Sequence, residues 1–330
     1  MQAMKRSTKP ASKTLVCTDF KVTYPNSQKS DQAHGDSVKT SAGSEPALQK
    51  SPFRSKDKPD ALDTEFLIEP AAAWKAMAQY SNFIIYGEKY SISDDVYVRH
   101  QGTPEKDASE GDYWVAKILE VRASSSSNVM TRVMWYYSPK DLPKKKGMST
   151  GARAYHGRHE LIASNHMDVV DVNSFAGKAL VVHWLEDDEE ELQRGLYWRQ
   201  TLDHRTSRLS NPRKHCICGK NYNPDRMMVF CSQDDCRIWN HEECLLNDAV
   251  TRRLSHDKLP RGAGVGKGKS KRHRQRDQSR PSQRGVSAHL LQGEGEILRL
   301  NISDLRPETA EGERISLEDI VCLKCGSNII

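Results

Sequence analysis

Eight metal-binding side chains, arranged in four close pairs in the last third of the chain, constrain its fold more than any other feature. The pairs are Cys216-x-Cys218, Cys231-x4-Cys236, His241-x2-Cys244 and Cys322-x2-Cys325. Structural zinc takes four thiolate or imidazole ligands in a tetrahedron, and a close pair supplies two of them from one tight turn. Eight ligands complete two tetrahedra and leave no position for a catalytic water. We therefore expect two structural Zn²⁺ ions; the competing interpretation is a scatter of buried cysteines.

The composition is too polar for a folded core along the whole chain. Of 330 residues, 36% are hydrophobic and 28% are charged, and the mean hydropathy is −0.74. A chain of this balance buries too little apolar surface to fold throughout. It has neither the run of roughly 18 apolar residues that spans a membrane nor the apolar core of a secretory signal. We expect an intracellular protein without a membrane partner, in a compartment that keeps thiols reduced.

Composition also divides the chain into regions. Residues 1–65 are rich in Ser, Thr, Lys, Pro and Gln and are expected to form a disordered tail. Residues 70–208 predict a short helix after Pro70, followed by a mainly β domain. Its β-branched and aromatic runs, separated by polar breaks, fall at 96–98, 113–121, 129–137 and 179–185. Residues 212–330 hold the metal ligands.

A basic segment interrupts the metal-binding region. Between residues 251 and 284, twelve Lys or Arg stand against two Asp, a local net charge of +10, so the rest of the chain carries −4 of the total of +6. Such a run is expected to be exposed, and we place a disordered insertion at about 252–312. It suits nuclear import, or non-specific contact with DNA phosphates.

The ligand order C4-H-C3, with Trp239 two residues before His241, resembles that of a plant homeodomain (PHD) finger. The resemblance implies a small cross-braced fold in which the ligand pairs interleave. By this resemblance one zinc is bound by Cys216, Cys218, His241 and Cys244, and the other by Cys231, Cys236, Cys322 and Cys325. The chain departs from the family in the 77 residues between Cys244 and Cys322, and in Ile320, where an aromatic residue is common.

Many PHD fingers bind the tail of histone H3, and the resemblance implies a peptide pocket in this one. Tyr222, Met228 and Trp239 match positions that line a methyl-lysine pocket in some of these fingers, and Asp225 would hold a basic residue of the peptide. In the competing interpretation, Trp239 and Met228 pack against the zinc core, as they do in fingers that bind no methylated peptide.

Three aromatic side chains of the β domain are expected to lie together. Side chains two apart on a strand share a face, so Trp135 and Tyr137 lie on one side of their strand. If residues 124–127 close a hairpin, positions summing to about 250 pair across it, which brings Trp114 opposite 135–137. Such a cluster suits a trimethyl-lysine, to which each aromatic face contributes ~0.5–2 kcal/mol. Ordinary core packing is the competing interpretation.

The runs DYWVAKILEV, VMWYYSPKDLP and SNHMDV resemble those of a bromo-adjacent homology (BAH) domain. Followed by a PHD finger, the domain resembles the BAH-PHD chromatin readers of plants and fungi. In relatives that recognise histone H3 trimethylated at lysine 27, three cage aromatics match Trp114, Trp135 and Tyr137, and two peptide-contacting residues match His166 and Asp168. The resemblance implies a barrel-like β domain in a nuclear protein that binds the H3 tail on nucleosomes and acts in transcriptional repression and facultative heterochromatin.

Two other classes of function compete with a histone reader. Zinc cross-braces also build ubiquitin ligases, some with the same ligand order, although Trp239 and the BAH-like region favour the reader. The other alternative is an architectural chromatin protein that binds DNA through the basic insertion. The sequence contains no HExxH, phosphate-loop or GxSxG motif, so we expect no enzyme.

Overall fold

The computed structural model describes residues 19–25, 45–54, 61–142, 154–186, 194–255, 282–283, 285–292, 298–307, 309 and 314–329. Its contacts divide the chain into two compact units, Met1–Pro212 and Arg213–Ile330, and each is described by itself below. No helix in these described ranges is long and apolar enough to cross a membrane.

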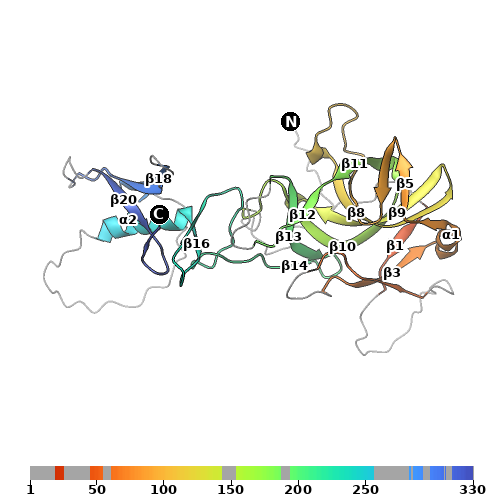
Figure 1. The fold of residues 1–330 in the computed structure, drawn as a ribbon, viewed down its shortest axis with the longest axis horizontal. Helices are drawn as coiled ribbons and strands as arrows, with labels where there is room; N and C mark the ends of the chain where they lie inside the picture. The colour runs from red at the N-terminus through yellow and green to blue at the C-terminus, as the bar shows by residue number, and fades with distance from the viewer. Residues whose placement is uncertain are drawn as a thin grey trace, which may run out of the picture. The chain divides into compact units, whose positions relative to one another are not determined.

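The first unit is built on a nine-stranded sheet (Figure 1). Its neighbouring strands follow the order β11-β7-β8-β9-β10-β13-β12, while β14 pairs with β13 and β4 with β8. In chain order the strands are β4 (Ala78–Tyr80), β7 (Asp95–Val98), β8 (Trp114–Ser125), β9 (Asn128–Tyr137), β10 (Glu160–Asp171), β11 (Phe175–Ala179), β12 (Val181–His183), β13 (Leu196–Asp203) and β14 (Arg208–Leu209). The mainly β prediction is confirmed, although β10 and β13 were not among the predicted strands.

The β8–β9 hairpin has the predicted register. Val115 pairs with Tyr136 and Ala116 with Trp135, and residues 124–127 lie at the turn. Because side chains alternate across the sheet, Trp135 enters one buried cluster, whereas Val115 and Tyr136 enter another on the opposite face. The hairpin therefore supplies both layers of the core.

Short elements surround this sheet. The predicted helix is α1 (Ala71–Ala76), shorter than the apolar run that suggested it, because the chain continues directly into β4. A separate two-stranded hairpin consists of β5 (Asn82–Ile85) and β6 (Glu88–Ser91). In the part of the chain that the structure describes, the connections include the 3₁₀ turns η1 (Glu110–Asp112), η2 (Pro139–Asp141) and η4 (Val172–Ser174).

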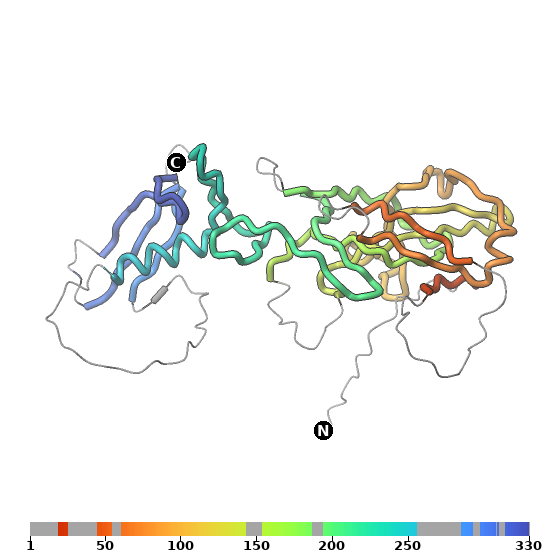
Figure 2. Tube along the Cα trace, turned by 90° about the horizontal axis from the view of Figure 1, so that it is seen from below, coloured from red at the N-terminus to blue at the C-terminus, as the bar shows by residue number. Residues whose placement is uncertain are grey.

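The prediction that residues 1–65 are a disordered tail is wrong for the parts that the structure describes. A three-stranded sheet, ordered β1-β3-β2, consists of β1 (Lys21–Thr23), β2 (Ala47–Gln49) and β3 (Thr64–Glu69), and β1 contacts β10 (Figures 1 and 2). Phe53 is buried against Tyr136 and Trp198. The aromatic residues of this segment thus join the core of the β domain. Residues 1–18, 26–44 and 55–60 lie outside the described residues.

The second unit combines one pair of short strands with a helix and a larger sheet. β15 (Met228–Phe230) pairs with β16 (Trp239–His241), and α2 (Glu242–Ser255) follows at once. The larger sheet has the order β17 (Ser282–Gln283), β18 (Val286–Gln292), β19 (Leu298–Asp304), β20 (Ile315–Val321) and β21 (Asn328–Ile329). Apolar side chains of α2, β18, β19 and β20 form one buried cluster with three of the cysteines.

The expected disordered insertion at about 252–312 is therefore wrong for the end of α2 and for β17, β18 and β19. The physical reason is alternation: Val286 and Ala288 in β18, and Leu300 and Ile302 in β19, are buried, while the residues between them are more exposed. The most basic part of the insertion, residues 256–281, lies outside the described residues.

Candidate functional site

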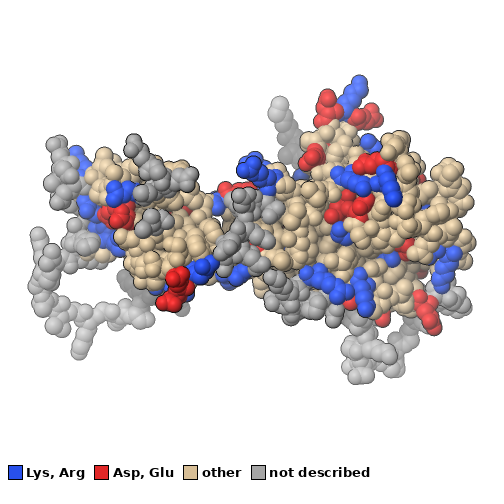
Figure 3. Space-filling view, in the orientation of Figure 1, with Lys and Arg blue, Asp and Glu red and all other residues tan. Residues whose placement is uncertain are grey.

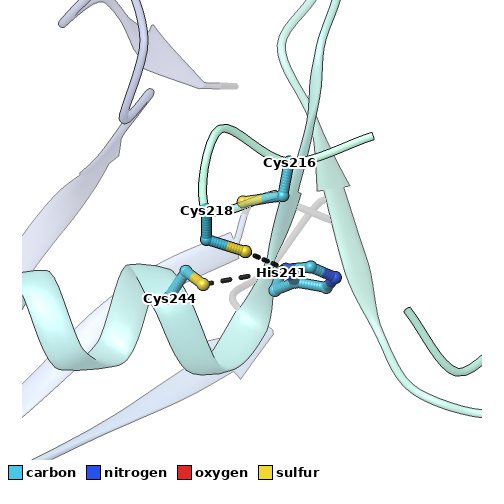
Figure 4. A group of neighbouring side chains, drawn as sticks. All are labelled: Cys216, Cys218, His241 and Cys244. Atoms are coloured by element: carbon cyan, nitrogen blue, oxygen red, sulfur yellow. Dashed lines mark hydrogen bonds between the residues drawn. The ribbon is translucent and has the colours of Figure 1, made fainter. Parts of the chain in front are cut away.

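The first group of metal-binding side chains joins three parts of the second unit (Figure 4). Cys216 and Cys218 come from a loop, His241 ends β16, and Cys244 lies in the first turn of α2. His241 Nδ1 is 3.2 Å from the Cys218 Sγ and 3.7 Å from the Cys244 Sγ. In a tetrahedral zinc site with ordinary bond lengths, an N–S edge is about 3.6 Å. The side chains therefore fit a Zn²⁺ ion.

The second group draws on residues far apart in the sequence. The Cys231 Sγ lies 3.7 Å from the Cys325 Sγ, and the Cys236 Sγ lies 3.6 Å from the Cys322 Sγ. These separations exclude S–S bonds and match the S–S edge of about 3.8 Å in a zinc tetrahedron. In each group the four ligand atoms lie within 4.8 Å of one another. The structure thus brings together the two interleaved sets of four that the sequence predicted, and both fit a structural metal ion.

Backbone and side-chain N–H groups surround the thiol groups. The Asn240 side chain lies 3.8 Å from the Cys322 Sγ, and the Lys324 backbone amide donates to the same sulfur at 3.4 Å. The Lys220 amide donates to the Cys218 Sγ at 3.4 Å. Donors at these positions stabilise thiolates and orient them toward a metal. Sequence reasoning had not identified Asn240, which is buried between the short strands and the second group.

The residues predicted to line a peptide pocket in the finger lie in different environments. Met228 and Trp239 lie on the same face of the β15–β16 pair, where the Trp239 ring is 4.9 Å from that of Phe230. Tyr222 is buried and packs edge-on against His215. Asp225 is exposed. The Tyr222 ring therefore packs inside the unit, while Met228 and Trp239 share a half-buried surface with Phe230.

The three aromatic residues predicted for a cage lie at the end of the β8–β9 hairpin. The rings of Trp114 and Trp135 meet edge to face, with centroids 5.4 Å apart and an interplanar angle of 84°. Tyr137 belongs to the same buried cluster, on the same face of β9 as Trp135. Trp135 is 1% exposed and Tyr137 7%, whereas Trp114 is half-buried. The Trp135 ring is therefore closed to a ligand in this structure, and side chains of the cluster must move to open it.

A histidine that sequence reasoning missed covers part of this cluster. The His100 ring stacks on Trp114 with centroids 4.7 Å apart. Its Nδ1 accepts a hydrogen bond of 2.9 Å from the Gly102 amide, which holds the ring in place. The alternation of aromatic residues along the strands does not predict this contact, because His100 comes from the loop before β8.

His166 and Asp168 lie beside the aromatic cluster on β10. The hydroxyl of Tyr137 is 2.8 Å from His166 Nδ1, and the other neighbour of this imidazole is His204, whose ring stacks on it at 3.9 Å. Burial raises the pKa of the Tyr137 hydroxyl. The hydroxyl therefore stays protonated at neutral pH beside this imidazole nitrogen. His204 is a second residue that sequence reasoning missed.

Asp168 is an acidic group on the same face of the sheet as Trp135, opposite Val133 in the β9–β10 pairing. Burial raises the pKa of its carboxyl to about 6, against opposing effects of hydrogen bonds from the Val169 amide and the Trp135 side chain. A buried carboxylate with few donors favours a cation brought close to it. The arrangement of Trp114, Trp135, Tyr137 and Asp168 can thus present aromatic faces and one negative charge to a cationic ligand.

The comparisons with known proteins identify the larger part of the first unit. The family model described as the BAH domain matches residues 88–197. These residues form a BAH domain. The chain is also 31% identical over 156 residues to the chromatin remodeling protein EBS of Arabidopsis thaliana, a match that covers 46% of this chain and 62% of that protein. The predicted BAH domain is confirmed by the family model.

Two further matches concern the same region. The chromatin remodeling protein SHL of Arabidopsis thaliana is 26% identical over 137 residues, which are 40% of this chain and 57% of that protein. The crystal structure of the yeast Rsc2 BAH domain aligns with a TM-score of 0.30 and 16% identity, over 41% of this chain and 55% of that one. The chain thus spans somewhat more than half the length of the curated relatives it matches.

Proposed function

We propose that this protein is a nuclear histone reader whose BAH domain binds a methylated lysine of the histone H3 tail through Trp114, Trp135 and Tyr137. The observation that carries the proposal is the convergence of these rings at one end of the hairpin, inside a BAH domain and beside His166 and Asp168. The curated relatives, named chromatin remodeling proteins, support a role on nucleosomes.

Trimethyl-lysine suits this cluster better than an unmodified lysine. A trimethylammonium donates no hydrogen bond, and its diffuse charge is attracted to the faces of aromatic rings by ~0.5–2 kcal/mol each. Binding requires Trp114 and the His100 ring on it to move outward and uncover the Trp135 face. Asp168 then supplies a carboxylate at the edge of the cage. We propose trimethylated lysine 27 as the preferred mark, because His166 and Asp168 match the residues that contact the peptide in BAH domains of that specificity.

The second unit extends the proposal. We propose that the two groups of four ligands bind Zn²⁺ and stabilise a PHD finger, since their spacing fits a tetrahedral ion. The half-buried surface of Met228 and Trp239 would then bind a second part of an H3 tail, in the region of lysine 4, with Asp225 holding a basic residue. Acting together, the two modules would retain a repressor complex on facultative heterochromatin.

Titration with H3 peptides tests the proposal most directly. Peptides with lysine 27 or lysine 4 at each methylation state are titrated calorimetrically into the full chain, the Trp114→Ala and Trp135→Ala variants, and a Tyr80→Ala control. Tyr80 is 50% exposed and lies outside the cluster, whereas Trp114 is half-buried, so its truncation disturbs folding less than that of Trp135. The proposal predicts that both tryptophan variants lose trimethyl-lysine 27 binding and keep their zinc. Equal affinity of the wild-type chain for unmethylated peptide would refute it.

A second candidate function is DNA binding through the basic segment. Its local net charge of +10 between residues 251 and 284 favours contact with phosphates. On the face drawn in Figure 3, the Lys, Arg, Asp and Glu side chains of the described residues are interspersed, so the basic segment is the stronger candidate for a DNA contact. Removal of residues 256–281 should abolish salt-dependent DNA binding and leave methyl-peptide binding unchanged. Loss of both activities would instead favour an architectural protein.

A further inference from the structure

A pocket in the first unit lies on the face of the β8–β9 hairpin opposite to Trp135. Its volume is about 300 Å³, and β2, β3, α1, β8 and β9 all contribute to its walls. Arg132 lines it from β9 and Arg122 from β8. Strand alternation places these side chains on the side of Phe66 and Trp74, away from the proposed cage. The pocket is therefore a separate site.

Two arginines of this pocket share one carboxylate. The Arg122 Nε is 2.6 Å from Glu120 Oε1, and the Arg132 Nε is 3.0 Å from Glu120 Oε2. The three side chains are only 17%, 8% and 11% exposed, in the order Arg122, Arg132, Glu120. Within the described ranges neither arginine forms another ion pair. The other carboxylate of the lining, Glu45, is exposed and forms no ion pair with either arginine among the described residues. The two guanidinium groups therefore share a single buried carboxylate, an arrangement that an added anion would stabilise.

The guanidinium groups also retain hydrogen-bonding capacity. The Arg122 Nη1 donates to the carbonyl oxygens of Trp74 and Met77, at 3.3 and 3.0 Å, and the Arg132 Nη1 donates to Gln49 Oε1 at 2.6 Å. Among the described residues, neither Nη2 has a hydrogen-bond acceptor. A guanidinium fork with free N–H groups matches a carboxylate or phosphate, which accept two hydrogen bonds side by side.

Aromatic rings hold both guanidinium groups in place. The Arg132 guanidinium lies 4.5 Å from the Phe66 ring centroid, and that of Arg122 lies 5.4 Å from the Trp74 ring. Pre-positioned donors lose less conformational entropy when a ligand binds. Burial lowers the pKa of the Arg132 guanidinium, although Glu120 opposes this effect. The direction shows that the single carboxylate does not fully compensate the buried positive charge.

The rest of the lining decides which class of ligand fits. Seven of the thirteen lining residues are apolar, and one of them, Leu48, is 61% exposed at the mouth. The remaining cation at the pocket is Lys75. A nucleic acid backbone has no apolar side chains to cover Leu48 and needs several cations in a row. A peptide offers both an anionic group and apolar neighbours.

We propose that this pocket binds an acidic side chain of a partner peptide, a carboxylate or a phosphorylated hydroxyl, between Arg122 and Arg132. An apolar residue beside the acidic one covers Leu48. The site is independent of the proposed methyl-lysine cage and gives the BAH domain a second peptide contact. The site distinguishes acidic from neutral peptide segments, because a neutral segment cannot form the charge-assisted hydrogen bond. The loss of this bond weakens binding about 10–100-fold.

The test uses the full chain labelled with ¹⁵N-tryptophan, because the Trp74 indole lies beside Arg122 and reports on the pocket. Its signal is assigned with Trp74→Phe. The probes are inorganic phosphate and three peptides, identical except for a central Leu-Glu-Leu, Leu-phosphoSer-Leu or Leu-Gln-Leu. The Glu and phosphoSer peptides are expected to shift the Trp74 signal at concentrations at least about tenfold below the Gln peptide.

Two substitutions move the local charge in opposite directions. Arg122→Gln leaves one arginine on Glu120 and should weaken acidic-peptide binding at least about tenfold without loss of fold, because it removes the excess charge. Glu120→Gln should tighten binding, because both arginines then lack an anion. Arg122→Lys keeps the charge but not the fork, and should bind phosphoSer less tightly than the wild type does. A Glu105→Gln substitution at an exposed position of the loop before β8 serves as the control, because Glu105 does not line this pocket.

Three results would overturn the proposal. One is equal affinity for the Glu and Gln peptides. Another is a shift of the Trp74 signal when phosphate is added but not when either acidic peptide is added. The pocket would then be a site for a free anion and not for a peptide. The last is a preference of the pocket for duplex DNA over both acidic peptides, with Arg122→Gln weakening that binding. None of these results depends on the methyl-lysine cage.

Discussion

Replacing Asp168 with Asn should stabilise the BAH domain at neutral pH while weakening its binding of a methylated peptide. The carboxyl is largely buried beside Trp135, and burial raises its pKa from 3.8 to about 6. Ionisation at pH 7 therefore opposes folding. Asn keeps an oxygen that accepts from the Val169 amide, which bonds Asp168 Oδ1 at 3.0 Å, but carries no charge.

The size and sign of the effect follow from proton linkage. Between pH 4 and pH 6 the folded protein binds more protons at Asp168 than the unfolded chain does, so the free energy of unfolding falls as pH rises through this window. A difference of about two pKa units corresponds to about 3 kcal/mol at pH 8, and to about 1 kcal/mol at pH 4.5, as upper bounds. The Asn variant does not lose this unfolding free energy as the pH rises, because its side chain does not ionise. It should be about 1–3 kcal/mol more stable than the wild type at pH 8, with a smaller gain at pH 4.5.

Urea unfolding followed by tryptophan fluorescence measures this difference. Five of the six tryptophans lie in the first unit, so the signal reports on the BAH domain. Glu65→Gln removes an exposed carboxylate from β3 and controls for net charge. A variant that is no more stable than the wild type at pH 8, or whose gain is the same at both pH values, would refute the reasoning.

Peptide binding should change in the opposite direction. If Asp168 contacts a cationic lysine, wild-type affinity should rise as the carboxyl ionises near pH 6, and the Asn variant should lose this dependence. A more stable protein that binds less well would show that the buried charge is retained for function. Unchanged affinity in the variant would place Asp168 outside the binding site.

Further predictions concern other contacts of the two units. Arg199→Met should lower the free energy of unfolding of the first unit by about 3–5 kcal/mol, because it leaves Glu160 and Glu186 buried without their cation. Lys178→Ala, which breaks a more exposed pair with Asp94 in the same unit, should cost less than about 1 kcal/mol in the same urea titration. Tyr137→Phe should weaken methyl-peptide binding by about 1 kcal/mol in calorimetry, through loss of the hydroxyl contact to His166, and Trp114→Ala should weaken it more. His100→Ala should tighten binding, since it frees one face of Trp114. Chelation of zinc should abolish the protected amides of α2 and β18–β20 in hydrogen exchange and leave those of β8–β10 unchanged.

The sequence predicted those parts of the fold in which a local pattern determines the structure. Alternating apolar residues in β8 and β9 and the short polar turn between them specify one hairpin register, because a slip by one residue would turn Trp135 toward the opposite face. The eight metal ligands were equally predictable from their close pairs, and their division into two interleaved sets of four was implied by the resemblance to a PHD finger. The prediction was weaker for β1 and β2, which are three residues long and depend on pairing with β3.

The contacts of a side chain were harder to predict from the sequence than the strand and the face on which it lies. Strand periodicity indicated that Trp114, Trp135 and Tyr137 share a face, but His100 and His204 reach the cluster from other segments. The excess charge of the Arg122–Glu120–Arg132 group also depends on burial, which the alternation of residue types does not show. Contacts made by loops and by distant strands require the tertiary structure.

The insertion between Cys244 and Cys322 shows why composition misled the prediction there. The entropy of closing a structureless loop grows only with the logarithm of its length, so a loop of 77 residues is tolerated, but it would do nothing to position Cys322 and Cys325. The described residues instead form α2, which starts at the first group, and a sheet whose strand β20 leads directly into Cys322. Cys231, Cys236 and Cys322 are buried in the same cluster as the apolar residues of α2, β18, β19 and β20. The described part of the insertion therefore belongs to the core that positions the second metal site.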